Sequence, residues 1–230
     1  MRTDHLPVPR MFLNKFIVAV ATLVGCTTTM KDRSPALLPD GQVCCKSPDA
    51  SSRRGAIVRT AAKLVGARTI QVNGKRIAYD CAGVTRAIFL EHGIDLYGGG
   101  TTDRKANGVR LIHNHIRQHG TVHQGPAVRP GDLVFFDNTW DYNGDGIIND
   151  PLTHVGIVER QEPDGTVIFI SRVAGAIERY HMNLFLPHVH RTGEGKIIND
   201  YLRRKDFGDQ PHAGYLTGQL FAGFGTRTGL

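Results

Sequence analysis

The stretch YDCAGV, residues 79–84, is the most informative segment of this 230-residue chain. It places Cys81 where an extended segment turns into a predicted helix, with Asp80 before it to cap or brace the turn. Further along, THVGIV, residues 153–158, places His154 at the start of a predicted strand. A thiol attacks as the thiolate, and both a helix N-terminus and a nearby imidazole lower its pKa. Cys81 and His154 are therefore predicted to be a nucleophile and its base.

A third motif, RPGDLVFF at residues 129–136, lies between these two segments. The three motifs, in this order, resemble those of the NlpC-type cysteine peptidases over about residues 54–172. The resemblance implies an α+β, papain-like fold, in which N-terminal helices, one carrying the nucleophile, pack on an antiparallel sheet. It also implies hydrolysis of amide bonds in peptidoglycan stem peptides, with no cofactor required. The related CHAP amidases share much of the pattern.

The chain departs from the family pattern at two positions that bear on the site. Thr69 stands twelve residues before Cys81, where the family usually has an aromatic tyrosine, and is expected with Asp80 to support the site. The third polar residue of the family, usually His, Asn or Gln, aligns with Ser171. A serine hydroxyl accepts a hydrogen bond from an imidazole but orients it more weakly. His181 and Asn183 are alternative orienting residues.

The N-terminus has the pattern of a bacterial lipoprotein signal peptide. Residues 1–25 carry a few basic residues and then a nine-residue apolar run, residues 16–24, which is too short to span a bilayer. The run ends in LVGC, residues 23–26, which resembles a lipobox and predicts lipidation of Cys26. We expect an outer-membrane lipoprotein that faces the periplasm. An ordinary secretory peptide that is cleaved nearby is the alternative.

The two remaining cysteines and the net charge bear on which molecules the protein can bind. Cys44 and Cys45 are adjacent, so they pair with each other only under strain, and the sequence leaves open whether they bridge two chains or stay reduced. The formal net charge is +7, and it falls to +5 without residues 1–25, which hold three basic residues and one acidic residue. A modest positive charge suits anionic wall polymers and membrane surfaces. No nucleic-acid partner is predicted, because no basic and aromatic motif accompanies it.

Hydrophobic spacing and turn residues predict the organisation of the chain. We expect a signal peptide at 1–25, a flexible tether at 26–50, a hydrolase domain at 51–183 and a C-terminal extension packed on it at 184–230. Predicted helices span 51–66, 81–93 and 103–120. Predicted strands span 133–136, 155–159, 167–171 and 177–180, and a turn at 163–165 joins two of them as a hairpin. Helices followed by strands indicate an α+β fold.

The segment DYNGDGIIND, residues 141–150, matches the first half of a calcium-binding loop. Oxygen ligands fall at its first, third and fifth positions, a glycine at its sixth and a backbone carbonyl at its seventh. The glutamate expected at position 12 is absent, and an aspartate at position 10 is the substitute. A polar hairpin rich in Asn and Gly is the alternative. The candidate ligands are Asp141, Asn143, Asp145, Ile147 and Asp150.

Two other functions remain open from the sequence. One is a CHAP-like amidase or acyltransferase on the same scaffold, for which Asn183 is the more natural third residue. The other is a wall-binding lipoprotein that keeps the fold but has lost hydrolysis. The amidase is distinguished by which residue bonds the outer nitrogen of His154. The non-catalytic lipoprotein is distinguished by a Cys81 thiol of low reactivity.

Overall fold

The computed structural model describes residues 48–98 and 107–230. The helices in this part of the chain are α1 (Pro48–Lys63), α2 (Cys81–Leu90) and α3 (Gly108–His119). The strands are β1 (Gln71–Val72), β2 (Lys75–Arg76), β3 (Gly120–His123), β4 (Leu133–Phe136), β5 (His154–Gln161), β6 (Val167–Val173), β7 (Ala176–Met182) and β8 (Phe221–Arg227). The expected α+β class is confirmed.

Six of the strands form one antiparallel sheet in the order β3-β8-β4-β5-β6-β7, and β1 pairs with β2 in a separate small hairpin. Neighbours along β4-β5-β6-β7 are consecutive in sequence, so this half of the sheet is a meander. The predicted turn at residues 163–165 joins β5 to β6, with Gly165 at a φ of 83°. The four strands expected from the sequence are β4 to β7, most of them longer at their ends than predicted.

Helices α2 and α3 begin at capping residues that their sequences supply. The Asp80 side chain accepts a hydrogen bond from the Gly83 N–H at the start of α2. The Asn107 side chain accepts from the N–H groups of Val109 and Arg110 at the start of α3. Such caps satisfy N–H groups that lack a partner within the helix. The third helix was predicted to start at 103, which is wrong, because Asn107 is extended and α3 begins at Gly108.

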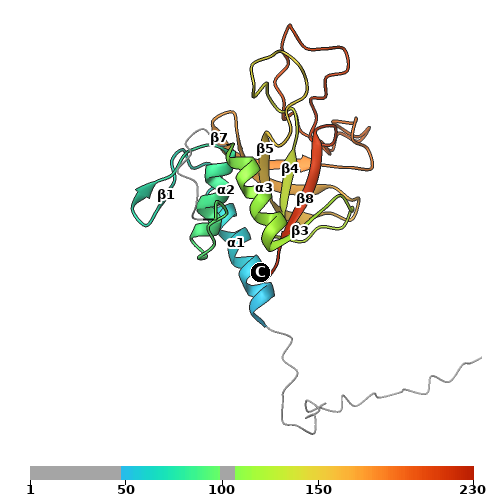
Figure 1. Ribbon diagram of the computed structural model, residues 1–230. Coiled ribbons are helices and arrows are strands. Elements are labelled where there is room, and N and C mark those ends of the chain that lie inside the picture. Colours follow the sequence, from blue (N-terminus) through green and yellow to red (C-terminus); the bar gives the residue numbers. More distant parts are fainter. Residues whose placement is uncertain (1–47, 99–106) are drawn as a thin grey trace, which may run out of the picture. The chain divides into compact units, whose positions relative to one another are not determined.

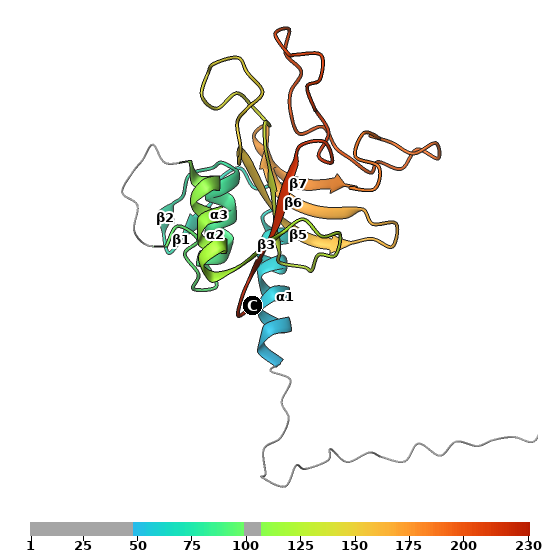
Figure 2. The same ribbon diagram turned by 45° about the vertical axis from the view of Figure 1, so that its right-hand side comes forward.

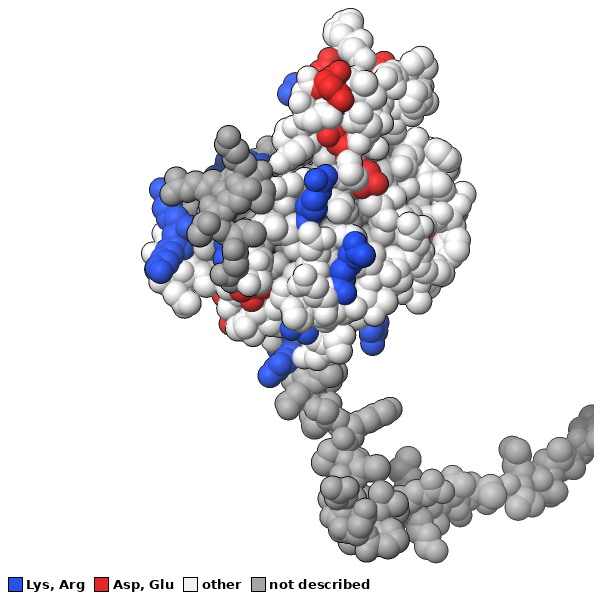
Figure 3. Space-filling model, viewed as in Figure 1, with Lys and Arg blue, Asp and Glu red and all other residues white. Residues whose placement is uncertain are grey.

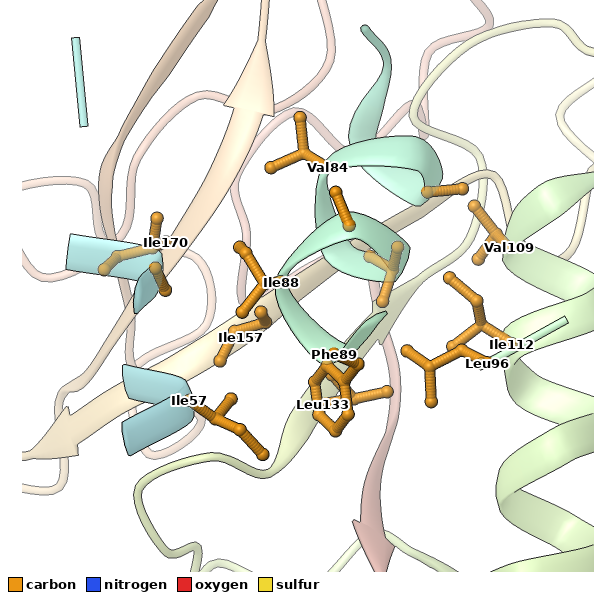
Figure 4. Packing of buried hydrophobic residues seen from close by; sticks show 14 of the residues in the cluster. Ile57, Val84, Ile88, Phe89, Leu96, Val109, Ile112, Leu133, Ile157 and Ile170 are labelled. Atoms are coloured by element: carbon orange, nitrogen blue, oxygen red, sulfur yellow. The ribbon is translucent and has the colours of Figure 1, made fainter. Parts of the chain in front are cut away.

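The main hydrophobic core contains side chains from the three helices and from one face of the sheet. Figure 2 shows α2 and α3 lying on the same side of the sheet. Figure 4 shows Ile88 and Phe89 of α2 among Ile57 of α1, Ile112 of α3 and Leu133 of β4. Burying each of these large apolar side chains contributes about 1.5–3 kcal/mol, so this packing holds α2 against the sheet.

A second core cluster includes residues of the opposite face of the sheet, among them Phe136 and Phe169. Leu202 and Leu220, which lie between β7 and β8, belong to the same cluster. The sheet is therefore covered on both faces, and part of the second cover comes from the segment expected to be an extension.

The segment 184–230, expected as a C-terminal extension packed on the domain, contributes strand β8 to the sheet. Strand β8 lies between β3 and β4 and pairs with both of them (Figure 1). Its sequence FAGFGTR lacks an alternating apolar pattern, because small residues occupy positions where α3 and β4 approach closely. A Cβ on Gly225 would lie 2.9 Å from the Phe135 ring and 3.1 Å from Ile116. The domain therefore extends through β8.

Several sequence-based predictions concern the N-terminus. The signal peptide at 1–25, the lipidation of Cys26 and the pairing of Cys44 and Cys45 lie outside the described residues, as does most of the expected tether. Helix α1 begins at Pro48, slightly before the predicted start of the domain. Across residues 48–98 and 107–230, no helix is long and apolar enough to cross a membrane.

Candidate active site

Cys81 is the first residue of α2, as the sequence predicts. The Asp80 carboxylate caps this turn through a 2.7 Å hydrogen bond from the Gly83 N–H. Gly83 is needed for packing, because a Cβ there would lie 2.0 Å from the carbonyl oxygen of Ala78. The Asp-Cys-x-Gly motif therefore holds the start of α2 close against the preceding segment, with the half-buried Cys81 thiol in place.

His154 is the first residue of β5 and pairs with Phe136 of β4. The residues before it are fixed by hydrogen bonds to the end of β4. The N–H of Thr153 donates to the carbonyl of Phe136 at 2.9 Å, and the N–H of Leu152 donates to the Asp137 carboxylate at 2.7 Å. His154 is 8% exposed, so its imidazole is held in a defined place by the sheet.

Ser171 of β6 lies against the outer nitrogen of that imidazole. The distance between His154 Nε2 and Ser171 Oγ is 2.8 Å, and Ser171 Oγ donates to the Val155 carbonyl at 2.7 Å. The single hydroxyl hydrogen is used on that carbonyl, so Ser171 can only accept from His154. Nε2 therefore carries the hydrogen in the neutral imidazole, and Nδ1 is the nitrogen left to act as a base.

The two alternative orienting residues lie elsewhere. His181 Nδ1 is 2.9 Å from the Asp200 carboxylate. The Asn183 side-chain oxygen accepts from the backbone N–H groups of Phe185 and Leu186, so this asparagine organises the turn after β7. Within the described part of the chain, Ser171 is the hydrogen-bond partner of the His154 ring.

Cys81 and His154 line one cavity of about 480 Å³. The cavity opens beside the N-termini of α2 and α3. Thr69 is exposed and lies outside its lining, so this residue does not replace the missing tyrosine. The lining residues are Asp80, Cys81, Ala82, Asn107, Gly108, Val109, Thr139, Trp140, Tyr142, Thr153, His154, Arg172, Val173, Ala174 and Leu202.

The pKa values of Cys81 and His154 differ from those expected of an activated thiol and its base. Burial raises the pKa of the Cys81 thiol to about 11, against a smaller lowering by the Val155 N–H and a raising by the Asp80 charge. Burial, with the Arg172 charge, lowers the pKa of His154 to about 3. The prediction of a depressed thiol pKa is therefore wrong for the resting thiol, because desolvation outweighs the helix N-terminus. The resting pair is a neutral thiol and a neutral imidazole.

The Pro-Gly-Asp motif is structural. Asp132 is 1% exposed, and its carboxylate accepts from Arg54 of α1 at 2.8 Å and from Thr226 of β8 at 3.0 Å. It also accepts from the Arg129 N–H at 2.9 Å. One buried carboxylate thus joins α1, the turn before β4, and β8. It stabilises the packing around β4, the strand that pairs with His154 of β5, and it lies outside the cavity lining.

The candidate calcium loop between β4 and β5 is exposed and bonded mainly to itself. Asp141 accepts from the N–H groups of Gly144 and Gly146 at 2.7 and 2.8 Å. Asp145 accepts from the Ile147 N–H at 2.7 Å, which lowers the pKa of its carboxyl. The Asn143 side chain accepts from the Asp145 N–H at 3.0 Å. The loop thus already directs several side-chain oxygens at its own backbone.

Asp150 differs from the other acidic residues of the loop because it is buried, and it accepts from the Tyr142 N–H at 3.1 Å. Among the described residues, no group of three or more His, Cys, Asp or Glu side chains is arranged to hold a metal ion. Calcium binding remains a prediction. Figure 3 shows acidic side chains gathered at the top of the view, where the loops at this end of the sheet project, whereas basic side chains are separated over the rest of that face.

Sequence reasoning missed several residues of the cavity. Arg172 directly follows Ser171, and Trp140 is the single tryptophan of the chain. Asn107 also lines the cavity, and its side chain donates to the Leu152 carbonyl at 3.1 Å, which ties α3 to the approach to β5. A local signal marks Asn107 only as the cap of α3, whereas its contact with Leu152 spans 45 residues.

Comparison with known proteins does not assign the chain to a family. No family model matches the chain, and no curated protein matches it. The motifs around Cys81, His154 and Ser171, together with their geometry, are therefore the observations that bear on function.

Proposed function

We propose that this chain is a lipid-anchored cysteine hydrolase that cleaves amide bonds in peptidoglycan stem peptides. The observation that carries the proposal is the placement of Cys81 and His154 on one cavity, with His154 Nε2 bonded to Ser171 at 2.8 Å. A thiol at a helix N-terminus, a base and a residue that orients the base are the parts that thiol acyl transfer requires. The antiparallel sheet with α2 packed on it agrees with the papain-like fold that the resemblance implies.

In the first half-reaction, His154 Nδ1 takes the Cys81 proton as the sulfur attacks the amide carbonyl. The carbonyl oxygen becomes an oxyanion, and backbone N–H groups at the start of α2 stabilise it. The N–H groups of Cys81 and Ala82 are placed for this, because both lie close enough to the sulfur to lower the thiol pKa. The imidazolium then protonates the leaving amine, and a thioester to Cys81 remains.

In the second half-reaction, His154 takes a proton from water, which attacks the thioester carbonyl. The carbon–sulfur bond breaks, the carboxylic acid leaves, and the proton returns to the Cys81 sulfur. Ser171 keeps the hydrogen on Nε2 throughout, so Nδ1 accepts and returns the proton in both half-reactions.

Burial shapes how the pair is activated. Each charge alone is disfavoured in this environment, as the pKa values of about 11 for Cys81 and about 3 for His154 indicate. A thiolate and an imidazolium that form together attract each other, which offsets part of their desolvation. We therefore expect proton transfer to accompany the attack, in place of a thiolate that stands ready in the resting enzyme.

The proposed location follows from the N-terminus. Lipidation of Cys26 attaches the chain to the outer membrane, and about 0.8 kcal/mol per buried methylene makes several acyl chains a firm anchor. The segment between Cys26 and α1 then separates the membrane from the hydrolase domain, which faces peptidoglycan in the periplasm.

The test is a digestion of purified peptidoglycan by the full-length protein in detergent. We expect released peptide fragments, identified by mass spectrometry, with a loss of at least about a thousandfold in Cys81→Ala. The matched control is Cys44→Ser/Cys45→Ser, which removes two other thiols and should leave the release unchanged. Equal release by Cys81→Ala would overturn the proposed nucleophile, and the mass of the fragments identifies the bond that is cut.

One observation favours a second candidate, a wall-binding lipoprotein that has lost hydrolysis. Burial keeps the Cys81 thiol protonated at neutral pH. On this reading, Cys81→Ala and the wild type bind peptidoglycan equally and neither releases fragments. The amidase reading of the CHAP type has less support, because Asn183 bonds its own turn and lies away from the His154 ring.

A further inference from the structure

Arg172 is placed to meet a substrate at the cavity. It directly follows Ser171 on β6 and lines the same cavity as Cys81 and His154. Its Nε is buried and has no hydrogen-bond partner, and no carboxylate pairs with its guanidinium anywhere in residues 48–98 and 107–230. A cation that lines a cavity and has no counter-ion among the described residues is a candidate binding group for a ligand.

Other arginines of the domain show what Arg172 lacks. Arg54 pairs with Asp132 at 2.8 Å, Arg86 with Asp95 at 2.7 Å, and Arg179 with Glu159 at 2.8 Å. Each of these guanidinium groups therefore has a carboxylate partner within the fold. Among the described residues that line the cavity, the acidic one is Asp80, and its carboxylate accepts a hydrogen bond from the Gly83 N–H. Arg172 is therefore the cation that the described lining offers to a ligand, and the Asp80 carboxylate is turned to the start of α2.

Tyr79 holds the Arg172 side chain in position. The guanidinium carbon lies 5.2 Å from the centroid of the Tyr79 ring. The Tyr79 hydroxyl donates to the Ala67 carbonyl, which fixes the ring two residues before the nucleophile. A guanidinium stacked on an aromatic ring keeps its N–H edge available for a planar, bidentate acceptor. Such an acceptor is a carboxylate.

Two aromatic side chains also line the cavity. The rings of Trp140 and Tyr142 meet edge to face at 5.2 Å, and Trp140 is 53% exposed. An exposed indole beside a cavity favours contact with an apolar or ring-shaped part of a ligand. The cavity lining thus combines a cation, two aromatic rings and the thiol of Cys81.

We propose that Arg172 binds a carboxylate of the substrate that flanks the scissile amide, so that the enzyme selects acidic peptides over their neutral amides. This inference rests on the proposed function, because it names the substrate class of the same site. Arg172 also lowers the pKa of His154 through its charge. The test must therefore separate a binding role from an effect exerted through the imidazole.

The experiment compares two forms of one ligand. Purified stem-peptide fragments are used as isolated and after conversion of their carboxylates to amides with a carbodiimide and ammonium. We expect the full-length wild type to prefer the native fragments by on the order of tenfold to a hundredfold in kcat/KM. Arg172→Met should lose this preference, because its kcat/KM for the native fragments falls to its kcat/KM for the amidated fragments. Arg172→Lys should be intermediate.

Two results would overturn the carboxylate site. One is equal kcat/KM of the wild type for both forms. The other is a parallel fall for both forms in Arg172→Met together with a shifted pH profile, which would mean that Arg172 acts through His154. The melting temperature of each variant checks that it is folded. If Arg172→Met has a lowered melting temperature, the preference for native over amidated fragments is compared between the wild type and Arg172→Lys.

Binding to Cys81→Ala separates this proposal from hydrolysis. Isothermal titration of Cys81→Ala and Cys81→Ala/Arg172→Met with both ligand forms measures the site without turnover. Carboxylate preference that depends on Arg172, with no cleavage by the wild type, would refute the hydrolase and support the site. Cleavage by the wild type without carboxylate preference would refute the site alone, and an absence of both cleavage and binding would refute both.

Discussion

Two acidic turns flank strand β4, and they differ in where their carboxylates find partners. Before β4, the buried Asp132 is bonded by Arg54 and Thr226, which are 78 and 94 residues away in the sequence. After β4, the half-buried Asp141 is bonded by N–H groups only three and five residues away. The first turn joins distant elements, whereas the second closes on itself.

The difference shows that a motif of acidic residues does not by itself indicate a site. Asp132 belongs to the motif that supports the family resemblance, yet its role is to clamp the frame. Asp141 belongs to a loop that resembles a metal site, yet its described contacts are those of a capped turn. Burial and long-range partners determine how much each carboxylate contributes, and four perturbations test this ranking.

The largest effect is expected from Asp132→Ala. Removal of this carboxylate leaves the Arg54 guanidinium, which is 12% exposed, without its partner in a buried setting. Breaking such a pair from one side costs about 3–5 kcal/mol. Urea unfolding should show this loss, while Asp141→Ala should lose about 1 kcal/mol or less. Equal losses in the two variants would remove the distinction between the turns.

The next effect concerns His154 in acid. Its folded pKa of about 3 lies below its ordinary value of 6.5, so its neutral form stabilises the fold above about pH 6.5. This stability declines as the pH falls toward 3, by about 3 kcal/mol at pH 4. Urea unfolding at pH 7 and pH 4 should show a smaller acid loss in His154→Gln than in the wild type. An identical loss in both proteins would mean that the imidazole is not buried.

A smaller effect is expected from Ser171→Ala. The change leaves the Nε2 hydrogen of His154 without its acceptor and frees the ring to turn. We expect kcat for peptide release to fall by about tenfold to a hundredfold, with KM nearly unchanged, because substrate contacts are kept. Ser171→Asn should recover part of the rate, since its side-chain oxygen also accepts. No change in Ser171→Ala would show that the orientation of His154 does not depend on this bond.

The smallest effect is expected at the acidic loop. If calcium binds there, a concentration of ten times its Kd raises the unfolding free energy by about 1.4 kcal/mol. The melting temperature of the wild type should rise with calcium and fall back with a chelator. Asp145→Asn, which keeps the size of the side chain, should not respond. A response of equal size in that variant would place any calcium elsewhere on the chain.

The local elements were predictable because their signals are local. Asp80 caps α2 three residues from its partner, and Val84, Ile88 and Phe89 face the core as their spacing indicates. The apolar run of β4 is likewise evident from the sequence. Strand β8 was missed, because its glycines reflect the approach of α3 and β4 and have no meaning within the segment itself.

In the candidate site, too, residues with a local sequence signal were predicted and residues defined by long-range contacts were not. Cys81, His154 and Ser171 were found from motif order and alignment. Arg172 was missed because its significance is the absence of a counter-ion among the described residues, which only the folded arrangement reveals. The direction of the Cys81 pKa was also predicted wrongly, since a helix N-terminus is visible in a sequence and desolvation is not.

The sequence by itself determined the α+β class, the candidate nucleophile and base, and the caps and turns that start the elements, because each depends on residues a few positions apart. Only the tertiary structure decided that Asp132 is a clamp, that Ser171 and not Asn183 holds His154, and that the chain closes its sheet with β8. These outcomes depend on contacts across 17 to 94 residues and on the exclusion of water. Neither is encoded in any single segment of the chain.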